Sequence, residues 1–127
     1  MRDGKPTFYV IDDDSVLRKL ISGILRDVGL ELLGTGETGE IGLKECHDKH
    51  PDLVLLDINL PGSSGFDVLA SLKRMRKAPR VVMITSEATM ERVKAAVQLG
   101  ADSFVVKPFT SAKLLGAVES VLKIKLT

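Results

Sequence analysis

The sequence predicts an α/β protein: a doubly wound, five-stranded parallel sheet with five helices on its two faces. Five short runs of aliphatic and β-branched residues alternate along the chain with five segments in which apolar residues recur at helical spacing. The third run, Leu53–Leu56, is apolar throughout and lies between Pro51 and Pro61-Gly62, as in a strand buried on both faces. Strands that alternate with helices in this way form a parallel sheet, because right-handed crossovers place helices on both sides.

Length and composition indicate one globular domain. The chain has 127 residues, enough to bury a core without disulfides or a structural metal, and its contents of 44% hydrophobic and 28% charged residues are those of a water-soluble protein. The net charge of +1 favours neither nucleic acid nor an anionic membrane as a direct partner. Cys46 is the single cysteine, so no internal disulfide forms.

The sequence also predicts a cytoplasmic location. No apolar run approaches the roughly 20 residues that span a bilayer. Residues 1–6 form a short polar lead without the apolar core of a signal peptide. No repeat, linker or low-complexity segment interrupts the rest of the chain, so we expect residues 1–127 to form a single domain.

The first strand and helix are predicted from a change of pattern at a group of acids. Thr7–Ile11 is a β-branched and aromatic run, and it stops at Asp12-Asp13-Asp14-Ser15, where acidic side chains cap the first turn of a helix. That helix ends at Gly29. Its inward stripe is predicted to comprise Leu17, Leu20, Ile21, Ile24, Leu25 and Val28.

The next strand and helix have weaker patterns. Leu30–Thr35 is interrupted by Gly34, and its polar Glu31 and Thr35 suggest an edge strand. A helix follows from about Thr38 to Lys49, with glycines that cost helix propensity but let its backbone approach the sheet closely. Its predicted inward residues are Gly39, Gly42, Leu43 and Cys46.

The second half of the chain supplies two more strands and three helices. The loop Pro61–Gly65 leads into the third helix, Arg80–Ile84 forms the fourth strand, and a helix runs from about Thr89 to Leu99. Phe104–Val106 is the fifth strand, and Ser111 caps the last helix. The residues expected to face the sheet from these three helices are Phe66, Leu69, Leu72 and Met75, then Met90, Val93 and Val97, then Leu114, Leu115, Val118, Val121 and Leu122.

Four of the predicted strands end in side chains that can carry chemistry. Because the strands are parallel, their carboxyl ends share one edge of the sheet, and in open α/β sheets ligands bind at that edge. These side chains are Asp12, Asp13 and Asp14 after the first strand, Asp57 after the third, Thr85 after the fourth and Lys107 after the fifth.

Together these groups suit phosphoryl transfer to a carboxylate. Carboxylates crowded at neighbouring strand ends raise each other's pKa unless a cation lies between them, and oxygen ligands without His or Cys favour Mg²⁺ over Zn²⁺. Lys107 adds a positive charge and Thr85 a hydroxyl donor around Asp57, which would be the nucleophile. Singly, each residue has an ordinary explanation, such as a helix cap for Asp14, so the hypothesis rests on the set.

Four stretches of the chain resemble the signature motifs of the receiver domains of two-component response regulators, of the single-domain, chemotaxis-regulator kind. The resemblance extends from about Thr7 to Leu126 and implies a flavodoxin-like sheet with strand order 2-1-3-4-5. The whole chain, 1–127, would then be one receiver domain. The stretches are Val10–Ser15, Asp57–Gly65, Ile84-Thr85-Ser86 and Val105–Phe109.

The resemblance implies a role for each residue at the strand ends. Asp57 is the phosphoacceptor, and Thr85 and Lys107 contact the phosphoryl oxygens. The implied ligands of the Mg²⁺ cofactor are Asp12, Asp13, Asp57 and the main-chain carbonyl of Asn59. Asn59 and Glu87 occupy positions that govern the lifetime of the phosphoryl group. Because both side chains can hydrogen-bond an attacking water, we expect moderately fast self-hydrolysis.

The resemblance also implies the reaction and the partners. The phosphoryl group comes from a phosphohistidine of a sensor histidine kinase or a histidine phosphotransfer protein, and the domain later hydrolyses its own acyl phosphate. The protein would thus be a regulatory switch and not an enzyme acting on other substrates. It would act either as a single-domain regulator, through contacts with a downstream protein partner, or as part of a longer protein with an output domain. We expect a monomer, with a phosphorylation-driven dimer left open.

Phosphorylation in such a domain changes one face of the molecule. The resemblance implies that the Thr85 hydroxyl moves toward the phosphoryl group, that the ring of Phe104 turns inward behind it, and that the Lys107-Pro108 bond is cis. Many relatives have tyrosine at the position of Phe104. The alternative to a ring that turns is that Phe104 is a fixed part of the core. The exposed members of the face of the fourth helix, fifth strand and fifth helix are expected to include Lys94, Gln98, Phe104, Lys113 and Glu119.

Three other functions are consistent with parts of the pattern. A haloacid-dehalogenase-like phosphatase also uses a strand-end Asp, Mg²⁺ and a Lys, but needs a second Asp where this chain has Asn59. A receiver domain that only docks to a partner and is never phosphorylated is a second alternative. Such a domain would not need Asp13, Asp57, Thr85 or Lys107. Flavin binding would need Gly and hydroxyls after the first strand instead of acids. His47 and His50 are expected to be solvated residues at a helix end, and Cys46 a small core residue.

Overall fold

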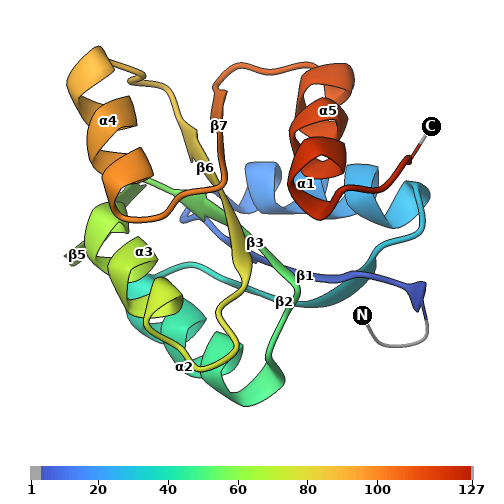
Figure 1. Ribbon diagram of the computed structural model, residues 1–127, viewed down its shortest axis with the longest axis horizontal. Helices are drawn as coiled ribbons and strands as arrows, with labels where there is room; N and C mark the ends of the chain where they lie inside the picture. Colours follow the sequence, from blue (N-terminus) through green and yellow to red (C-terminus); the bar gives the residue numbers. More distant parts are fainter. Residues whose placement is uncertain (1–3, 127) are drawn as a thin grey trace.

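The computed structural model describes residues 4–126, and its centre is a five-stranded parallel sheet (Figure 1). Its strand order, β2-β1-β3-β6-β7, is 2-1-3-4-5 when only the strands of this sheet are counted along the chain, so the predicted doubly wound sheet is confirmed. The edge position predicted for the second strand is also confirmed. The strands are β1 (Thr7–Ile11), β2 (Glu31–Gly36), β3 (Leu53–Asp57), β6 (Arg80–Thr85) and β7 (Ser103–Val106).

Helices cover both faces of the sheet. One layer contains α1 and α5, and the other contains α2, α3 and α4 (Figure 1). The helices are α1 (Ser15–Asp27), α2 (Gly39–Lys49), α3 (Gly65–Lys73), α4 (Met90–Gln98) and α5 (Ser111–Leu122). None of the helices within residues 4–126 combines the length and the apolar character needed to cross a membrane. Of the predicted polar lead, residues 1–3 lie outside the described part of the chain.

The two layers divide the core by the alternation of the strands. In β3, Leu53 and Leu55 belong to the cluster that α1 and α5 cover, while Val54 and Leu56 belong to the cluster beneath α2, α3 and α4. All four side chains are fully buried. Burying each such side chain contributes about 1.5–3 kcal/mol, so a strand covered on both faces is among the most firmly held parts of the fold. Asp57 follows directly on this strand.

Three residues predicted to face the sheet are exposed instead. Leu20 in α1 is 50% exposed, and Met90 and Val97 in α4 are 73% and 62% exposed. In α4 the fully buried residue is Ala96, with Val93 partly covered. The helix is therefore rotated so that its apolar stripe lies only partly over the sheet. Spacing alone predicts such a stripe but not the direction in which it points.

Some element boundaries also differ from the prediction. Thr110, and not Ser111, caps α5, because its Oγ1 accepts a hydrogen bond of 3.1 Å from the Lys113 N–H. The segment predicted as the loop Pro61–Gly65 contains half of a small antiparallel hairpin, in which β4 (Asn59–Leu60) pairs with β5 (Ser63–Ser64). Glu119, predicted to be exposed, is partly buried and accepts a hydrogen bond of 2.7 Å from the Leu126 N–H.

A partly buried ion pair connects the amino ends of two strands to a helix. Asp102 accepts hydrogen bonds from Lys73 Nζ at 2.6 Å, from the Val81 N–H at 2.8 Å and from Arg80 Nη1 at 3.3 Å. Burial acts to raise the pKa of Asp102, but the hydrogen bonds from Lys73 and Val81 outweigh it, and the net pKa is lowered. The charged form of Asp102 is therefore the one that the fold favours.

This lowered pKa predicts a pH-dependent contribution to stability. A carboxyl group with a folded-state pKa below its unfolded value of about 3.9 stabilises the fold above that pH, and the contribution is lost as the pH falls through the folded pKa. We expect Asp102→Asn to lower the free energy of unfolding by about 1–3 kcal/mol at pH 7 and by much less near pH 3. Urea denaturation at both pH values measures the difference, with the exposed Asp48→Asn as a control. An equal effect at both pH values would contradict the assignment.

Candidate functional site

The register of the sheet brings the predicted site residues to one edge. Ile11 of β1 pairs with Leu56 of β3, so the residues that follow them, Asp12 and Asp57, lie side by side. On the other side of β3, Asp57 pairs with Ile84, the residue before Thr85. The Lys107 N–H donates to the Thr85 carbonyl at 2.7 Å, which fixes the end of β7 beside β6. The parallel register alone therefore gathers residues from four separate parts of the chain.

Three carboxylates converge at this edge. Asp12, Asp13 and Asp57 each place one oxygen within 4.8 Å of the oxygens of the other two. Asp12 and Asp57 are 1% and 4% exposed, whereas Asp13 is exposed. Three hard anionic oxygens at this spacing, with one side open to solvent, fit a hexacoordinate Mg²⁺ that keeps several waters. These three residues are the carboxylates of the Mg²⁺ donor set that the resemblance implies.

Lys107 lies between the two buried carboxylates. Its Nζ is 3.2 Å from Asp12 Oδ2 and 3.4 Å from Asp57 Oδ2. Burial raises the pKa of Asp57, and the negative charge of Asp12 raises that pKa further; the Asn59 N–H and the ammonium of Lys107 act in the opposite direction. A carboxylate in this environment is less well solvated than one in water, which favours the approach of a cation or an electrophile.

Backbone N–H groups fix the other oxygen of each buried carboxylate. Asp57 Oδ1 accepts a hydrogen bond of 3.1 Å from the Asn59 N–H, and Asp12 Oδ1 accepts one of 2.8 Å from the Asp14 N–H. In both residues, Oδ2 is then the oxygen that faces Lys107. Asp14 is the N-cap of α1, as predicted, since its Oδ1 accepts from the N–H groups of Val16 and Leu17. Asp14 therefore turns away from the group of converging oxygens.

The remaining predicted site residues surround this centre in different ways. Thr85 is fully buried, and its Oγ1 accepts a hydrogen bond of 3.0 Å from the Glu87 N–H. Glu87 is exposed and pairs with Arg92 at 3.4 Å, while Asn59 is exposed at the start of the hairpin. Phe104, predicted to be exposed, is instead partly buried, because it packs against the core cluster beneath α2, α3 and α4. The Lys107-Pro108 bond is cis, as predicted.

Gly65 is a site-positioning residue that the sequence analysis treated only as part of a loop. A Cβ at Gly65 would lie 2.4 Å from the Asp57 carbonyl oxygen and 2.5 Å from Ile58 Cα. Its N–H donates to the Ile58 carbonyl at 2.7 Å. The start of α3 thus packs directly on the backbone that carries Asp57. The available signal was a glycine that follows a Ser cap in a strand-to-helix connection.

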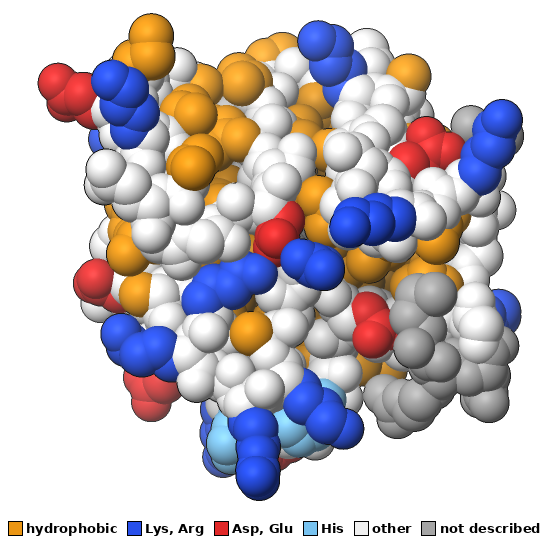
Figure 2. Space-filling view, viewed as in Figure 1, with side chains coloured by type: hydrophobic (Ala, Val, Ile, Leu, Met, Phe, Trp, Pro, Cys, Tyr) orange, Lys and Arg blue, Asp and Glu red, His pale blue; other side chains and the backbone are white. Residues whose placement is uncertain are grey.

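The histidines and the cysteine lie outside this centre. His47 and His50 are exposed at the end of α2, where Figure 2 shows them among Lys and Arg side chains at the bottom of the view. Cys46 is fully buried, as predicted, and burial raises the pKa of its thiol to about 12. A buried thiol with such a pKa stays protonated and packs as a small apolar group.

The fold and the site define a class of protein. An open, doubly wound parallel sheet with acids, a threonine and a lysine at its carboxyl edge is a flavodoxin-like α/β domain built to hold a ligand at that edge. Residues 8–119 match the family described as the response regulator receiver domain. The chain belongs to this family.

Individual relatives support the same assignment. The chemotaxis protein CheY of Pseudomonas aeruginosa is 32% identical over 117 residues, which are 90% of this chain and 94% of that protein. A CheY-like receiver domain protein from Methanospirillum hungatei has a TM-score of 0.87 at 26% identity, covering 94% of this chain and 95% of that one. A chain of the CheX-CheY-BeF3-Mg+2 complex from Borrelia burgdorferi has a TM-score of 0.88 at 29% identity, covering 92% and 89%. This chain is therefore a CheY-like regulatory domain.

The close approach at Gly65 predicts a large effect of adding one methyl group. We expect Gly65→Ala to lower the free energy of unfolding by more than about 2 kcal/mol, because the Cβ would meet backbone atoms that cannot yield. Gly116→Ala in α5 is the matched control. A Cβ there meets nothing within 4 Å, so helix propensity predicts a gain of about 0.5–1 kcal/mol. Chemical denaturation of both variants measures the contrast, and equal effects would show that the packing is not tight.

Proposed function

We propose that this chain is a phosphorylation-activated signalling switch and that Asp57 is its phosphoacceptor. The observation that carries the proposal is the position of Asp57: a nearly buried carboxylate, adjacent to Asp12, with one oxygen facing the ammonium of Lys107. No comparable group of acids and a cation occurs elsewhere among residues 4–126. The proposal treats residues 1–127 as a single receiver domain that acts in the cytoplasm as a monomer before phosphorylation.

The proposed reaction transfers a phosphoryl group from a phosphohistidine. The donor belongs to a sensor histidine kinase or a histidine phosphotransfer protein. The Asp57 Oδ2 atom attacks phosphorus, the P–N bond to the imidazole breaks, and the imidazole nitrogen keeps the electron pair. Asp57 Oδ1 stays bound to the Asn59 N–H, so the carboxylate presents one defined oxygen to the donor. In the later hydrolysis, water attacks phosphorus, the bond between Asp57 Oδ2 and phosphorus breaks, and inorganic phosphate, a proton and the free carboxylate are released.

Several residues would support this transfer. The proposed Mg²⁺ ligands are the carboxylates of Asp12, Asp13 and Asp57 and the main-chain carbonyl of Asn59. When bound, the ion offsets the negative charge on the transferred phosphoryl oxygens. Lys107 holds a further positive charge at the same place, and Thr85 can donate its hydroxyl hydrogen to a phosphoryl oxygen. Because Lys107 contacts both buried acids, a change in the charge of Asp57 would alter the position of the Lys107 ammonium.

The output would appear on the face formed by α4, β7 and α5. In Figure 2, hydrophobic side chains gather at the upper left, over α4 and beside β7. A surface of this kind suits a protein partner better than a nucleic acid. Thr85 and Phe104 would connect it to the site, because Thr85 of β6 pairs with the exposed Val106 of β7, and Phe104 of β7 pairs with Met83 of β6. The exposed apolar residues of this face are Met90, Val97, Leu99 and Val106.

Phosphorylation itself supplies the first test. Incubation with Mg²⁺ and a small-molecule acyl phosphate is expected to add one phosphoryl group, measured as intact mass. We expect no addition in Asp57→Asn or after EDTA treatment, and full addition in the control Asp48→Asn. Labelling that persists in Asp57→Asn would contradict the assignment of the acceptor. Catalytic turnover of a phosphomonoester would instead favour the phosphatase alternative.

The lifetime of the acyl phosphate supplies the second test. If the Asn59 and Glu87 side chains orient the attacking water, Asn59→Ala and Glu87→Ala should each lengthen the lifetime about twofold to tenfold, the worth of one ordinary hydrogen bond. The decay of intact phosphorylated mass measures it. Glu91→Ala, an exposed acid in the first turn of α4, is the control. Lifetimes that do not respond to either substitution would exclude both residues from hydrolysis.

A further inference from the structure

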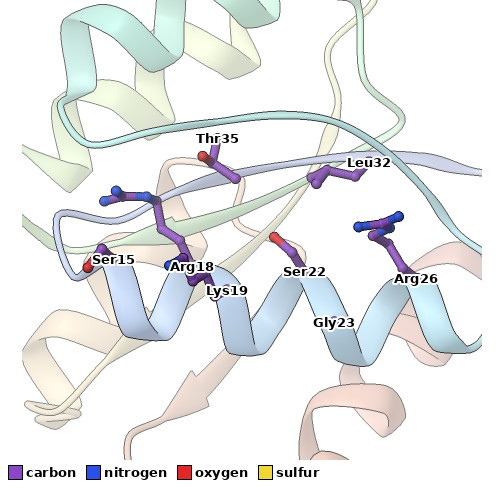
Figure 3. A pocket seen from close by; sticks show the side chains of 8 residues that line it. All are labelled: Ser15, Arg18, Lys19, Ser22, Gly23, Arg26, Leu32 and Thr35. Atoms are coloured by element: carbon purple, nitrogen blue, oxygen red, sulfur yellow. The ribbon is translucent and has the colours of Figure 1, made fainter.

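A second, chemically different site lies between α1 and the edge strand β2. The structure has a hollow of about 360 Å³ there, within the size range of small-molecule sites (Figure 3). Asp12, Asp13, Asp57 and Lys107 do not line it. Its lining residues are Ser15, Arg18, Lys19, Ser22, Gly23, Arg26, Leu32 and Thr35.

All the charged side chains that line the hollow are positive. Arg18, Lys19 and Arg26 contribute three cations to its lining, and no carboxylate lines it. Among the ion pairs of residues 4–126, none includes any of these three side chains. Three cations around one concave surface repel one another, and a bound anion would relieve that repulsion. The net charge of the whole chain is only +1, so this concentration is local.

A buried hydroxyl without a partner lies in the middle of the hollow. Ser22 is 8% exposed, and its Oγ has no hydrogen-bond partner. Figure 3 shows it directed from α1 toward β2, where Thr35 projects into the same space. A buried polar group without a hydrogen bond destabilises the fold, and a ligand acceptor would remove that penalty. Arg18, Ser22 and Arg26 follow one another at four-residue spacing and so share one face of α1.

The geometry points to a binding site for a phosphorylated small molecule of about nucleotide size. The Arg18 guanidinium is already positioned, because its Nη1 donates to the Asp12 carbonyl at 2.7 Å, which leaves its other N–H groups for an anion. Arg26 lies eight residues further along α1, about 12 Å at the helical rise, so the two arginines lie at opposite ends of the hollow and one of them can bind the phosphates while the rest of the ligand extends toward the other. Leu32 supplies an apolar wall, and the hydroxyls of Ser22 and Thr35 can donate to a ligand that lies between the two arginines.

The test is an amide chemical-shift titration of the ¹⁵N-labelled protein without Mg²⁺. The probes are inorganic pyrophosphate, ATP and, as an uncharged control, adenosine. We expect saturable shifts at Ser22, Gly23 and Thr35 with pyrophosphate and ATP, tighter binding of ATP than of pyrophosphate, and none with adenosine. The same shifts in Asp57→Asn would show that the site is separate from the proposed phosphoacceptor. Shifts spread over the surface without saturation would overturn the proposal.

Two substitutions distinguish a built site from a merely basic surface. Arg26→Gln should weaken binding roughly tenfold or more, since it removes charge-assisted hydrogen bonds, whereas Lys113→Gln on α5 should not. Ser22→Ala should weaken binding about twofold to tenfold while leaving the melting temperature unchanged or higher, because it removes an unpaired buried hydroxyl. A lower melting temperature with unchanged binding would make Ser22 structural and would overturn the proposal.

Discussion

The fold holds two carboxylates, Asp12 and Asp57, side by side where little water reaches them. The parallel pairing of β1 with β3 dictates this contact, because the two residues follow directly on paired positions. Left alone, two such charges would repel strongly and one would bind a proton. The surrounding structure opposes this by giving each acid a backbone N–H at one oxygen and Lys107 at the other. Much of the local architecture, including the tight approach of Gly65, serves to hold this arrangement.

The same arrangement explains why such a site can act as a switch. The raised pKa of Asp57 shows that burial and the charge of Asp12 are not fully offset by Lys107 and Asn59. A site with an unbalanced charge responds strongly to any cation or phosphoryl group that enters, and a shift of a few kcal/mol is enough to reverse a two-state equilibrium. In the proposed switch, Lys107 and Thr85 would transmit the change, because Lys107 follows β7 and Thr85 ends β6, the strands beside the exposed apolar face of α4. A change in charge at the carboxyl edge of the sheet would thus be connected to the packing of α4.

The sequence predicted the elements that depend on strong local patterns. The alternation of five strands with five helices predicted the parallel sheet, and the polar side chains at four strand ends predicted the edge where they converge, whereas the strand order came from the resemblance to receiver domains. Features that depend on tertiary distances could not be predicted. The rotation of α4, which buries Ala96 and exposes Met90 and Val97, depends on how closely the helix can approach the sheet. The pairing of Asn59 with Ser64 depends on the path of a short turn. The spacing of apolar residues along the sequence predicts neither the rotation of the helix nor the path of the turn.

Helix α1 connects the two sites that the structure contains. Its cap, Asp14, donates its N–H to the Asp12 carboxylate, and one turn later Arg18 donates to the Asp12 carbonyl. The backbone of Asp12 is therefore held from both the carboxylate edge and the hollow beside β2. An anion bound to the other N–H groups of Arg18 would share this guanidinium with the Asp12 carbonyl. Any resulting change in the affinity of the acids for a cation must be matched by an equal change in anion affinity, because coupling between two binding sites is reciprocal.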